Sequence, residues 1–404
     1  MTINPNKVLI IAHYPPPYGG ISSHIRDVTE RISSDNFIIN ILSFEKKFQH
    51  ERLNNFLNLF RVRNKILINL LPSYVVNIKS IIKIFKKLWS IKISVLNFFS
   101  ALNRSIIVNN YLRKLDINTV AIYGTETGVI IPFLKLLNPN LNICFTFYAA
   151  PIKDTNFFLK YKKFWEEVFL QSNKLSSSSK FCAQGANIIL KNINVQVIDV
   201  IYVGVELDRF PIKDDTFFIN KETKNILFVG RMLEEMGVKA VIEIAEKLIR
   251  LRDDVVFNII GATGTLNDLV YNVSKNSKGK IKHKFDVSDK DLNSYMNNCD
   301  ILIAPTVGSH ACMGVSVKEA LASGVPVVAS NSGGLPEAIQ NEVEGFVIPL
   351  VEGNIDILAF CEHIEILCND DVMRLRMGKN ARFKAEQKFS NQITEKKVAL
   401  FYKF

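Results

Sequence analysis

"MGVSVKEALASGVPVVAS", residues 313–330, decides how the C-terminal half of this chain folds. Apolar residues recur at helical spacing over 315–321, and 325–329 is a short apolar run that follows Gly324. The pattern predicts a helix, a turn and a buried parallel strand. Glu319 in this helix is either a surface carboxylate paired with the lysine beside it or a residue that binds a ligand.

The same alternation extends on both sides of this stretch. Strands are predicted at 225–230, 255–261, 300–306 and 345–350, and helices at 238–251 and 291–299. In the first half, a strand at Lys7–Ala12 leads through a Gly-rich turn to a helix capped at Ser22 or Ser23, and further strands are predicted at 37–44, 119–124 and 143–148. We therefore expect two Rossmann-like, doubly wound parallel-sheet α/β domains joined by a linker around 210–224, with ligands in a cleft at the strands' C-terminal ends.

Composition agrees with two domains, because 404 residues with 48% apolar content exceed what one core usually supports. Six cysteines without a C-x-x-C pair indicate reduced thiols, and the N-terminus has no run long enough for a signal peptide. We expect a cytoplasmic protein.

The net charge of +11 comes from one segment, since residues 53–115 hold eleven Lys and Arg and no Asp or Glu. Residues 78–99 place apolar side chains near one helical face and lysines opposite. This basic amphipathic segment, 61–114, either rests on an anionic membrane surface, such as the inner face of the plasma membrane, or packs on its own domain with a solvated lysine face. Nucleic-acid binding is disfavoured because no recognised motif accompanies the charge.

Six motifs in order carry a family resemblance: "GGISSH", "YVGVELDRF", "FVGRMLEEMG", "DILIAPT", the stretch quoted above, and "SGGLPEAI". Together they resemble glycosyltransferase family 4, the retaining nucleotide-sugar transferases of the GT-B fold. The resemblance implies an N-terminal acceptor-binding domain at 1–210 and a C-terminal donor domain at 223–385. It also implies that a final helix at 386–404 returns to the first domain.

The resemblance implies roles for particular residues. Glu319 would accept hydrogen bonds from the donor ribose, and Arg231 would bind the diphosphate and serve catalysis. The remaining donor-binding candidates are Gly19, Gly20, Gly261, Val287 in the loop 286–288, and the backbone of Gly314, Val315, Ser316 and Val317 at a helix N-terminus.

The sequence departs from the family at three places. Met236 stands where the family has lysine, Ala311 where it has the first of two glutamates, and Phe147 and Tyr148 where it has a histidine. Lys239, three residues after Met236, lies on another helical face, and Lys318 or His310 could serve instead. The remaining candidates are His310 as a catalytic group and His24 and Tyr148 on the acceptor side.

The sequence thus predicts a metal-independent hexosyltransferase with no cofactor besides a nucleotide-sugar co-substrate of the UDP or GDP type. Its acceptor would be a surface polysaccharide or lipid-linked glycan. Asp289 and Asp291 could also be the D-x-D motif of a metal-binding transferase. We favour the alternative that they open a helix, because acidic residues stabilise a helix N-terminus. A non-catalytic GT-B partner of a membrane glycan assembly and a nucleotide-sugar 2-epimerase are the alternatives.

Overall fold

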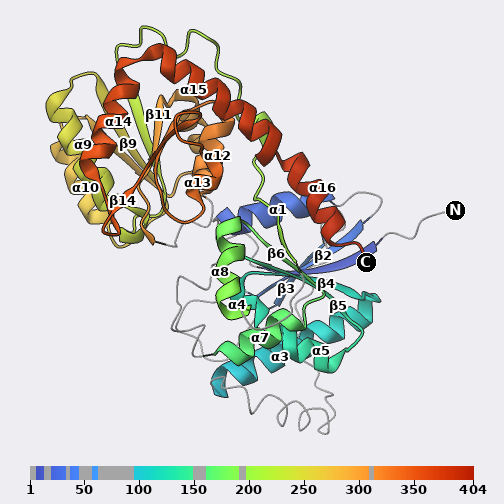
Figure 1. The fold of residues 1–404 in the computed structure, drawn as a ribbon. Helices are drawn as coiled ribbons and strands as arrows, with labels where there is room; N and C mark the ends of the chain where they lie inside the picture. The colour runs from blue at the N-terminus through green and yellow to red at the C-terminus, as the bar shows by residue number, and fades with distance from the viewer. Residues whose placement is uncertain are drawn as a thin grey trace. The chain divides into compact units, whose positions relative to one another are not determined.

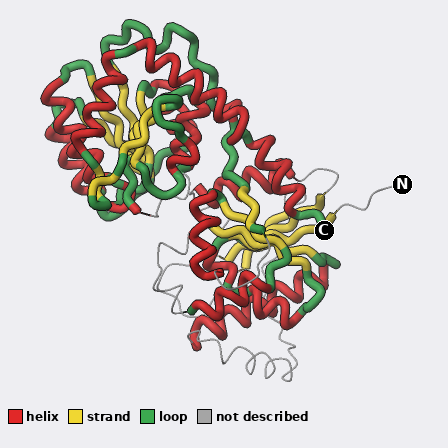
Figure 2. The backbone as a smooth tube through the Cα atoms, viewed as in Figure 1, coloured by secondary structure: helices red, strands yellow, loops and turns green. Residues whose placement is uncertain are grey.

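The computed structural model describes residues 6–12, 20–32, 37–44, 57–61, 95–148, 161–190, 197–308 and 314–404. They form two compact units, one running to Tyr202 and including 394–404, the other Val203–Ile393. In each unit the strands form the centre and the helices the outside (Figure 2). The two-domain α/β fold predicted from the alternation of strands and helices is confirmed.

The first unit contains a seven-stranded sheet in the order β3-β2-β1-β4-β5-β6-β7. All neighbouring pairs are parallel except β2 and β3, so the predicted parallel sheet is confirmed over six strands and carries one antiparallel strand, β3, at its edge. The strands are β1 (Asn6–Ile11), β2 (Phe37–Phe44), β3 (Leu57–Arg61), β4 (Thr119–Tyr123), β5 (Asn142–Phe147), β6 (Lys174–Ser177) and β7 (Ile198–Val200).

Six helices of the described residues accompany this sheet: α1 (Gly20–Ile32), α3 (Val95–Leu115), α4 (Thr125–Gly128), α5 (Ile131–Leu137), α7 (Lys162–Leu170) and α8 (Lys180–Leu190). Helix α1 begins at Gly20, before the caps expected at Ser22 or Ser23. Most of the basic amphipathic segment, 62–94, lies outside the described residues. Its described end, α3, buries Leu102, Val108 and Leu112 in the first unit and packs against α5.

The second unit contains six parallel strands in the order β10-β9-β8-β11-β12-β13, flanked by helices on both sides (Figure 1). They are β8 (Lys224–Val229), β9 (Val255–Gly261), β10 (Ile281–Phe285), β11 (Ile301–Ala304), β12 (Val327–Ser330) and β13 (Gly345–Ile348), followed by a small hairpin of β14 (Leu350–Val351) and β15 (Asn354–Ile355). The helices are α9 (Val238–Leu251), α10 (Asn267–Asn276), α11 (Asp289–Asn298), α12 (Val315–Ala322), α13 (Leu335–Ala338), α14 (Ile357–Asn369) and α15 (Asp371–Lys384).

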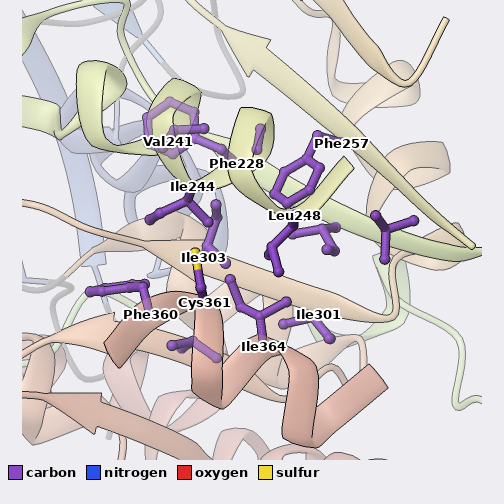
Figure 3. Close-up of a cluster of buried hydrophobic side chains, with 14 of the residues drawn as sticks. Phe228, Val241, Ile244, Leu248, Phe257, Ile301, Ile303, Phe360, Cys361 and Ile364 are labelled. Carbon is purple, nitrogen blue, oxygen red and sulfur yellow. The ribbon is translucent and has the colours of Figure 1, made fainter. Parts of the chain in front are cut away.

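The core of the second unit lies between its sheet and the helices α9 and α14. Figure 3 shows Phe228 and Phe257 from the strands in one cluster with Leu248 of α9 and Ile364 of α14. Each of these side chains is at most 3% exposed. Burial of apolar surface contributes about 25 cal/mol per Å², so this cluster is the main source of the free energy that packs the helices on the sheet.

The expected linker at 210–224 belongs to the second unit instead. Phe210 and Phe218 are each 1% exposed, and Lys221 donates to both carboxylate oxygens of Asp300 at 2.8 and 2.9 Å. The chain passes between units at 202–203 and again at 393–394. The segment therefore looks like a linker in composition but is packed, because its aromatic residues are buried.

After the π-helical turn Ala385–Phe389, α16 (Asn391–Phe401) carries the chain into the first unit. There the Tyr402 hydroxyl hydrogen-bonds the Tyr123 hydroxyl, and the Cys144 thiol donates to the Phe401 carbonyl oxygen at 3.3 Å. The five described cysteines are buried and free of disulfides.

Candidate functional site

The donor-site candidates of the second unit gather at the C-terminal ends of its strands. Strand order changes direction between β8 and β11, which makes this the topological switch point where such sheets bind ligands. Arg231 follows β8 by two residues, and its side chain is exposed at this edge. Helix α12 begins after β11, on the other side of the switch point.

Two backbone segments approach closely beside Arg231. A Cβ at Gly261 would lie 2.0 Å from the Gly230 carbonyl oxygen, so only glycine allows β9 to end here. The Asp286 N–H donates to the Gly261 carbonyl at 2.8 Å, which adds the loop 286–288, with the half-buried Val287, to the same edge. The sequence-predicted residues Arg231, Gly261 and Val287 thus lie at or just beyond the C-terminal ends of three adjacent strands, β8, β9 and β10.

Gly314 is the N-cap of α12 and has a left-handed backbone, at φ 53°. A Cβ there would lie 2.8 Å from Leu335 Cδ2, so a side chain would be both strained and crowded. Glycine has no side chain that could accept a hydrogen bond, so Gly314 does not cap the first backbone amides of α12, those of Val315 and Ser316. A helix N-terminus of this kind favours a bound anion such as a phosphate.

Glu319 and Lys318 are not a surface ion pair. Lys318 is fully buried, and its ammonium donates to the Val203 carbonyl at 2.6 Å. Burial lowers the pKa of Lys318 to about 7, and the Glu319 carboxylate opposes this lowering. Glu319 itself is half-buried. The surface-pair alternative for Glu319 is therefore wrong, and Lys318 is already bonded elsewhere.

Among the described neighbours of Met236, no lysine takes the place of the one that the family resemblance expects. Met236 ends a 3₁₀ turn and packs against the core, while exposed Lys239 donates to Glu234 at 2.8 Å. Arg231, by contrast, forms no ion pair with any described residue. This leaves Arg231 as the described cation best placed to meet a phosphate at the end of β8.

Asp289 and Asp291 form the first turn of α11, as predicted. The helix is capped by Ser288, whose hydroxyl oxygen accepts the Asp291 N–H at 3.2 Å, and Asp291 pairs with Lys284 at 2.9 Å. These contacts, Lys284 first, hold the pKa of Asp291 below its usual value. Within the described ranges, no three His, Cys, Asp or Glu side chains gather closely enough to hold a metal ion.

The candidates outside the second unit's sheet edge are described only in part. Gly19 and His310 lie outside the described residues, as does Ala311; Gly20 is the first residue of α1, and of His24 only the helical backbone is described. Tyr148 is 6% exposed and stacks on Tyr123 with ring centroids 6.2 Å apart. Burial raises the pKa of Tyr148 well above its ordinary value.

Sequence reasoning missed two serines that hold the loop after β11. The Ser330 hydroxyl donates to the Thr306 carbonyl and the Ser332 hydroxyl to the Gly308 carbonyl, each at 2.5 Å. Both serines lie at or just beyond the end of β12, so they fix the start of the loop that leads to α12. The available signal was the stretch "SNSGG" at 330–334, in which two small hydroxyl residues precede two glycines.

Residues 210–384 match the family "Glycosyl transferases group 1". A protein of the cps region of Klebsiella pneumoniae, described as an uncharacterized 41.2 kDa protein, is 30% identical over 276 residues, which are 64% of this chain and 72% of that protein. The Escherichia coli UDP-Gal:alpha-D-GlcNAc-diphosphoundecaprenol alpha-1,3-galactosyltransferase is 24% identical over 69% of this chain and 73% of its own length.

The Staphylococcus aureus capsular polysaccharide biosynthesis glycosyltransferase CapM is 29% identical over 202 residues, 49% of this chain. The match spans 50% of the length of CapM, so about half of that relative is compared. Among the described residues, no helix combines the length and apolar character needed to cross a membrane.

Solved structures share the fold over almost the whole chain. A glycosyltransferase from Rickettsia africae covers 99% of this chain and 98% of its own, with a TM-score of 0.70 at 19% identity. Anabaena Alr3699/HepE in complex with UDP covers 98% of both chains, with a TM-score of 0.65 at 13% identity. These structures show the fold alone. The family rests on the group 1 match together with the Klebsiella relative: the chain belongs to the glycosyl transferases group 1.

Proposed function

We propose that this chain is a hexosyltransferase that moves a sugar from a nucleotide-sugar donor, of the UDP type, to a glycan acceptor of surface-polysaccharide synthesis. The observation that carries the proposal is the grouping of Arg231, Gly261 and the N-terminus of α12 at one sheet edge. The grouping provides a cation, a closely approachable backbone and a helix N-terminus, which together suit a diphosphate.

The donor would lie along this edge with its ribose at Glu319 and its diphosphate at the α12 N-terminus. A carboxylate suits a vicinal diol, because it offers two acceptor oxygens and no competing donor. UDP is preferred over GDP on the likeness to Anabaena Alr3699/HepE, which binds UDP. A finer assignment, to glycosyltransferase family 4 with retention of anomeric configuration, rests on the six motifs.

The proposed reaction breaks the bond between the sugar's anomeric carbon and the diphosphate oxygen. A bond to the acceptor hydroxyl oxygen forms on the same face, and the hydroxyl proton passes to the departing diphosphate. Arg231 would stabilise the charge that develops on the diphosphate, and orientation of the acceptor would supply much of the remaining rate. The chemistry therefore needs no nucleophile from the protein, and Met236 in place of a lysine weakens charge stabilisation without removing it.

The acceptor is proposed to be lipid-linked, because the E. coli relative is named for a diphosphoundecaprenol-linked acceptor and the segment 61–114 is basic. We further propose that this segment holds a cytoplasmic enzyme on anionic membrane. Flotation with vesicles of phosphatidylglycerol and phosphatidylcholine tests this, with pure phosphatidylcholine vesicles as the control. Protein that stays at the bottom of both gradients would contradict the membrane proposal and leave the transferase proposal standing.

A thermal-shift titration with UDP, GDP, ADP, TDP, CMP and their sugar conjugates tests the donor site. A ligand at about a hundred times its dissociation constant stabilises the folded protein by about 2.7 kcal/mol. We expect UDP or a UDP-sugar to raise the melting temperature of wild type and of Glu362→Ala, an exposed carboxylate on α14, by the same amount, and to raise that of Glu319→Ala by clearly less. No shift with any nucleotide would favour the non-catalytic partner instead.

A further inference from the structure

Lys318 is the least expected residue of the donor helix. Its side chain is fully buried in the second unit, and within the part of the chain that the structure describes its three N–H groups make one hydrogen bond, to the Val203 carbonyl oxygen at 2.6 Å. The ammonium also lies 6.0 Å from the centroid of the Phe389 ring. A buried cation with one acceptor is costly, and a leucine would fill much of the same space without that cost. This cost suggests a role beyond packing.

The two groups that Lys318 meets belong to the two segments by which the chain enters and leaves the second unit. Val203 is the first residue of that unit, and Phe389 lies four residues before its end at Ile393. The segments are bonded to each other: the Val205 N–H donates to the Phe389 carbonyl at 2.7 Å and the Asn391 N–H to the Val205 carbonyl at 3.0 Å. Residues 203–205 and 389–391 are called the connecting pair below.

Lys318 also joins this connecting pair to the donor site. It precedes Glu319 in α12, an eight-residue helix whose two neighbouring residues cannot move independently. At the other end of the helix, Arg382 donates to the Ala322 carbonyl and the Phe210 carbonyl, both at 2.6 Å. A shift of α12 that brings the Glu319 carboxylate to the ribose would therefore also displace Lys318 and, through its hydrogen bond, the Val203 carbonyl.

We propose that Lys318 is a positioning residue that couples nucleotide binding at Glu319 to the connecting pair. The inference rests on the proposed function, because it needs a nucleotide at Glu319. Burial lowers the pKa of Lys318 to about 7, and both the amine and the ammonium can donate to Val203, so the link persists on either side of neutral pH. Nucleotide binding would then reduce local opening of the connecting pair, through which the chain enters and leaves the second unit.

Hydrogen exchange of single amides, with and without saturating UDP, tests the coupling. We expect UDP to slow exchange of the Val205 and Asn391 amides at least tenfold in the wild-type chain. In Lys318→Met, UDP should bind within threefold of wild-type affinity by calorimetry, but exchange at both amides should change less than twofold. Lys318→Arg keeps a cationic donor and should recover the protection.

Lys388→Met is the matched control. Its ammonium lies 5.3 Å from the centroid of the same Phe389 ring but donates to the Glu337 carbonyl, so the variant should behave as wild type. Equal UDP-dependent protection in Lys318→Met and wild type would overturn the coupling. If Lys318→Met does not fold, the wild-type measurement still tests the inference. UDP binding that leaves the exchange rates of the Val205 and Asn391 amides unchanged would overturn it. If wild type binds no UDP, the proposed donor site fails and the inference falls with it.

Discussion

Gly237 and Gly353 have the same backbone angle but different surroundings, and this pair separates two reasons for needing glycine. Both have φ of 81°, in the left-handed region that side chains rarely adopt. A Cβ at Gly353 would meet nothing within 4 Å, whereas a Cβ at Gly237 would lie 1.8 Å from the Pro305 carbonyl oxygen. Gly237 ends the motif "GRMLEEMG" and is the N-cap of α9, and Pro305 follows β11.

The magnitudes follow from these contacts. A left-handed backbone costs an alanine about 1–2 kcal/mol, and this applies to both variants. At Gly237 the clash with a backbone oxygen cannot be relieved by rotating a side chain, so α9 or the β11 loop must shift, which costs about 1–3 kcal/mol more. Gly353→Ala should therefore lose about 1 kcal/mol and Gly237→Ala about 3 kcal/mol.

Differential scanning calorimetry of the full chain measures both losses. For a domain of this size, 1 kcal/mol corresponds to about 2–4 °C in melting temperature, so we expect falls of about 3 °C for Gly353→Ala and about 9 °C for Gly237→Ala. Gly237→Ala should also weaken UDP binding, because the displaced loop precedes the donor helix. Equal falls for the two variants would refute the argument and leave backbone angle as the sole reason for Gly237.

Three further predictions concern charged groups. Glu319→Ala should weaken UDP binding at least tenfold by calorimetry, because a hydrogen bond to a charged group contributes about 1.5–3 kcal/mol; unchanged affinity would remove the ribose assignment. Asp300→Ala should lower the free energy of unfolding in urea by about 3 kcal/mol, because the carboxylate is fully buried and holds Lys221 and the Asn225 N–H; a loss below about 1 kcal/mol would contradict this. The pKa of Lys318 is about 7 in the folded chain, against an ordinary 10.5, so between these pH values the unfolded chain binds more protons than the folded one. The free energy of unfolding of wild type should therefore rise with pH from 7 to 10, by at most about 1.4 kcal/mol per pH unit. In Lys318→Met this contribution to the free energy of unfolding should be absent when urea unfolding is measured from pH 7 to 10.

Strand β10 shows where local sequence reasoning stopped. The segment "IKHKF" was not predicted as a strand, because three of its five residues are basic or histidine. It is nevertheless the edge strand beside β9, where lysines are common since they discourage pairing with another chain. The linker expected at 210–224 failed for a similar reason, because burial of Phe218 depends on residues far away in the sequence.

The sequence by itself determined the elements whose patterns are local. Helix α9 at Val238–Leu251 and strand β9 at Val255–Gly261 begin and end where the apolar periodicity predicted, and the motif order identified the family. Only the tertiary structure decided that Lys318 is buried against Val203 while its neighbour Glu319 is half-exposed. Helical geometry turns successive side chains by about 100°, but which side is covered depends on segments more than a hundred residues apart, and no local pattern encodes that.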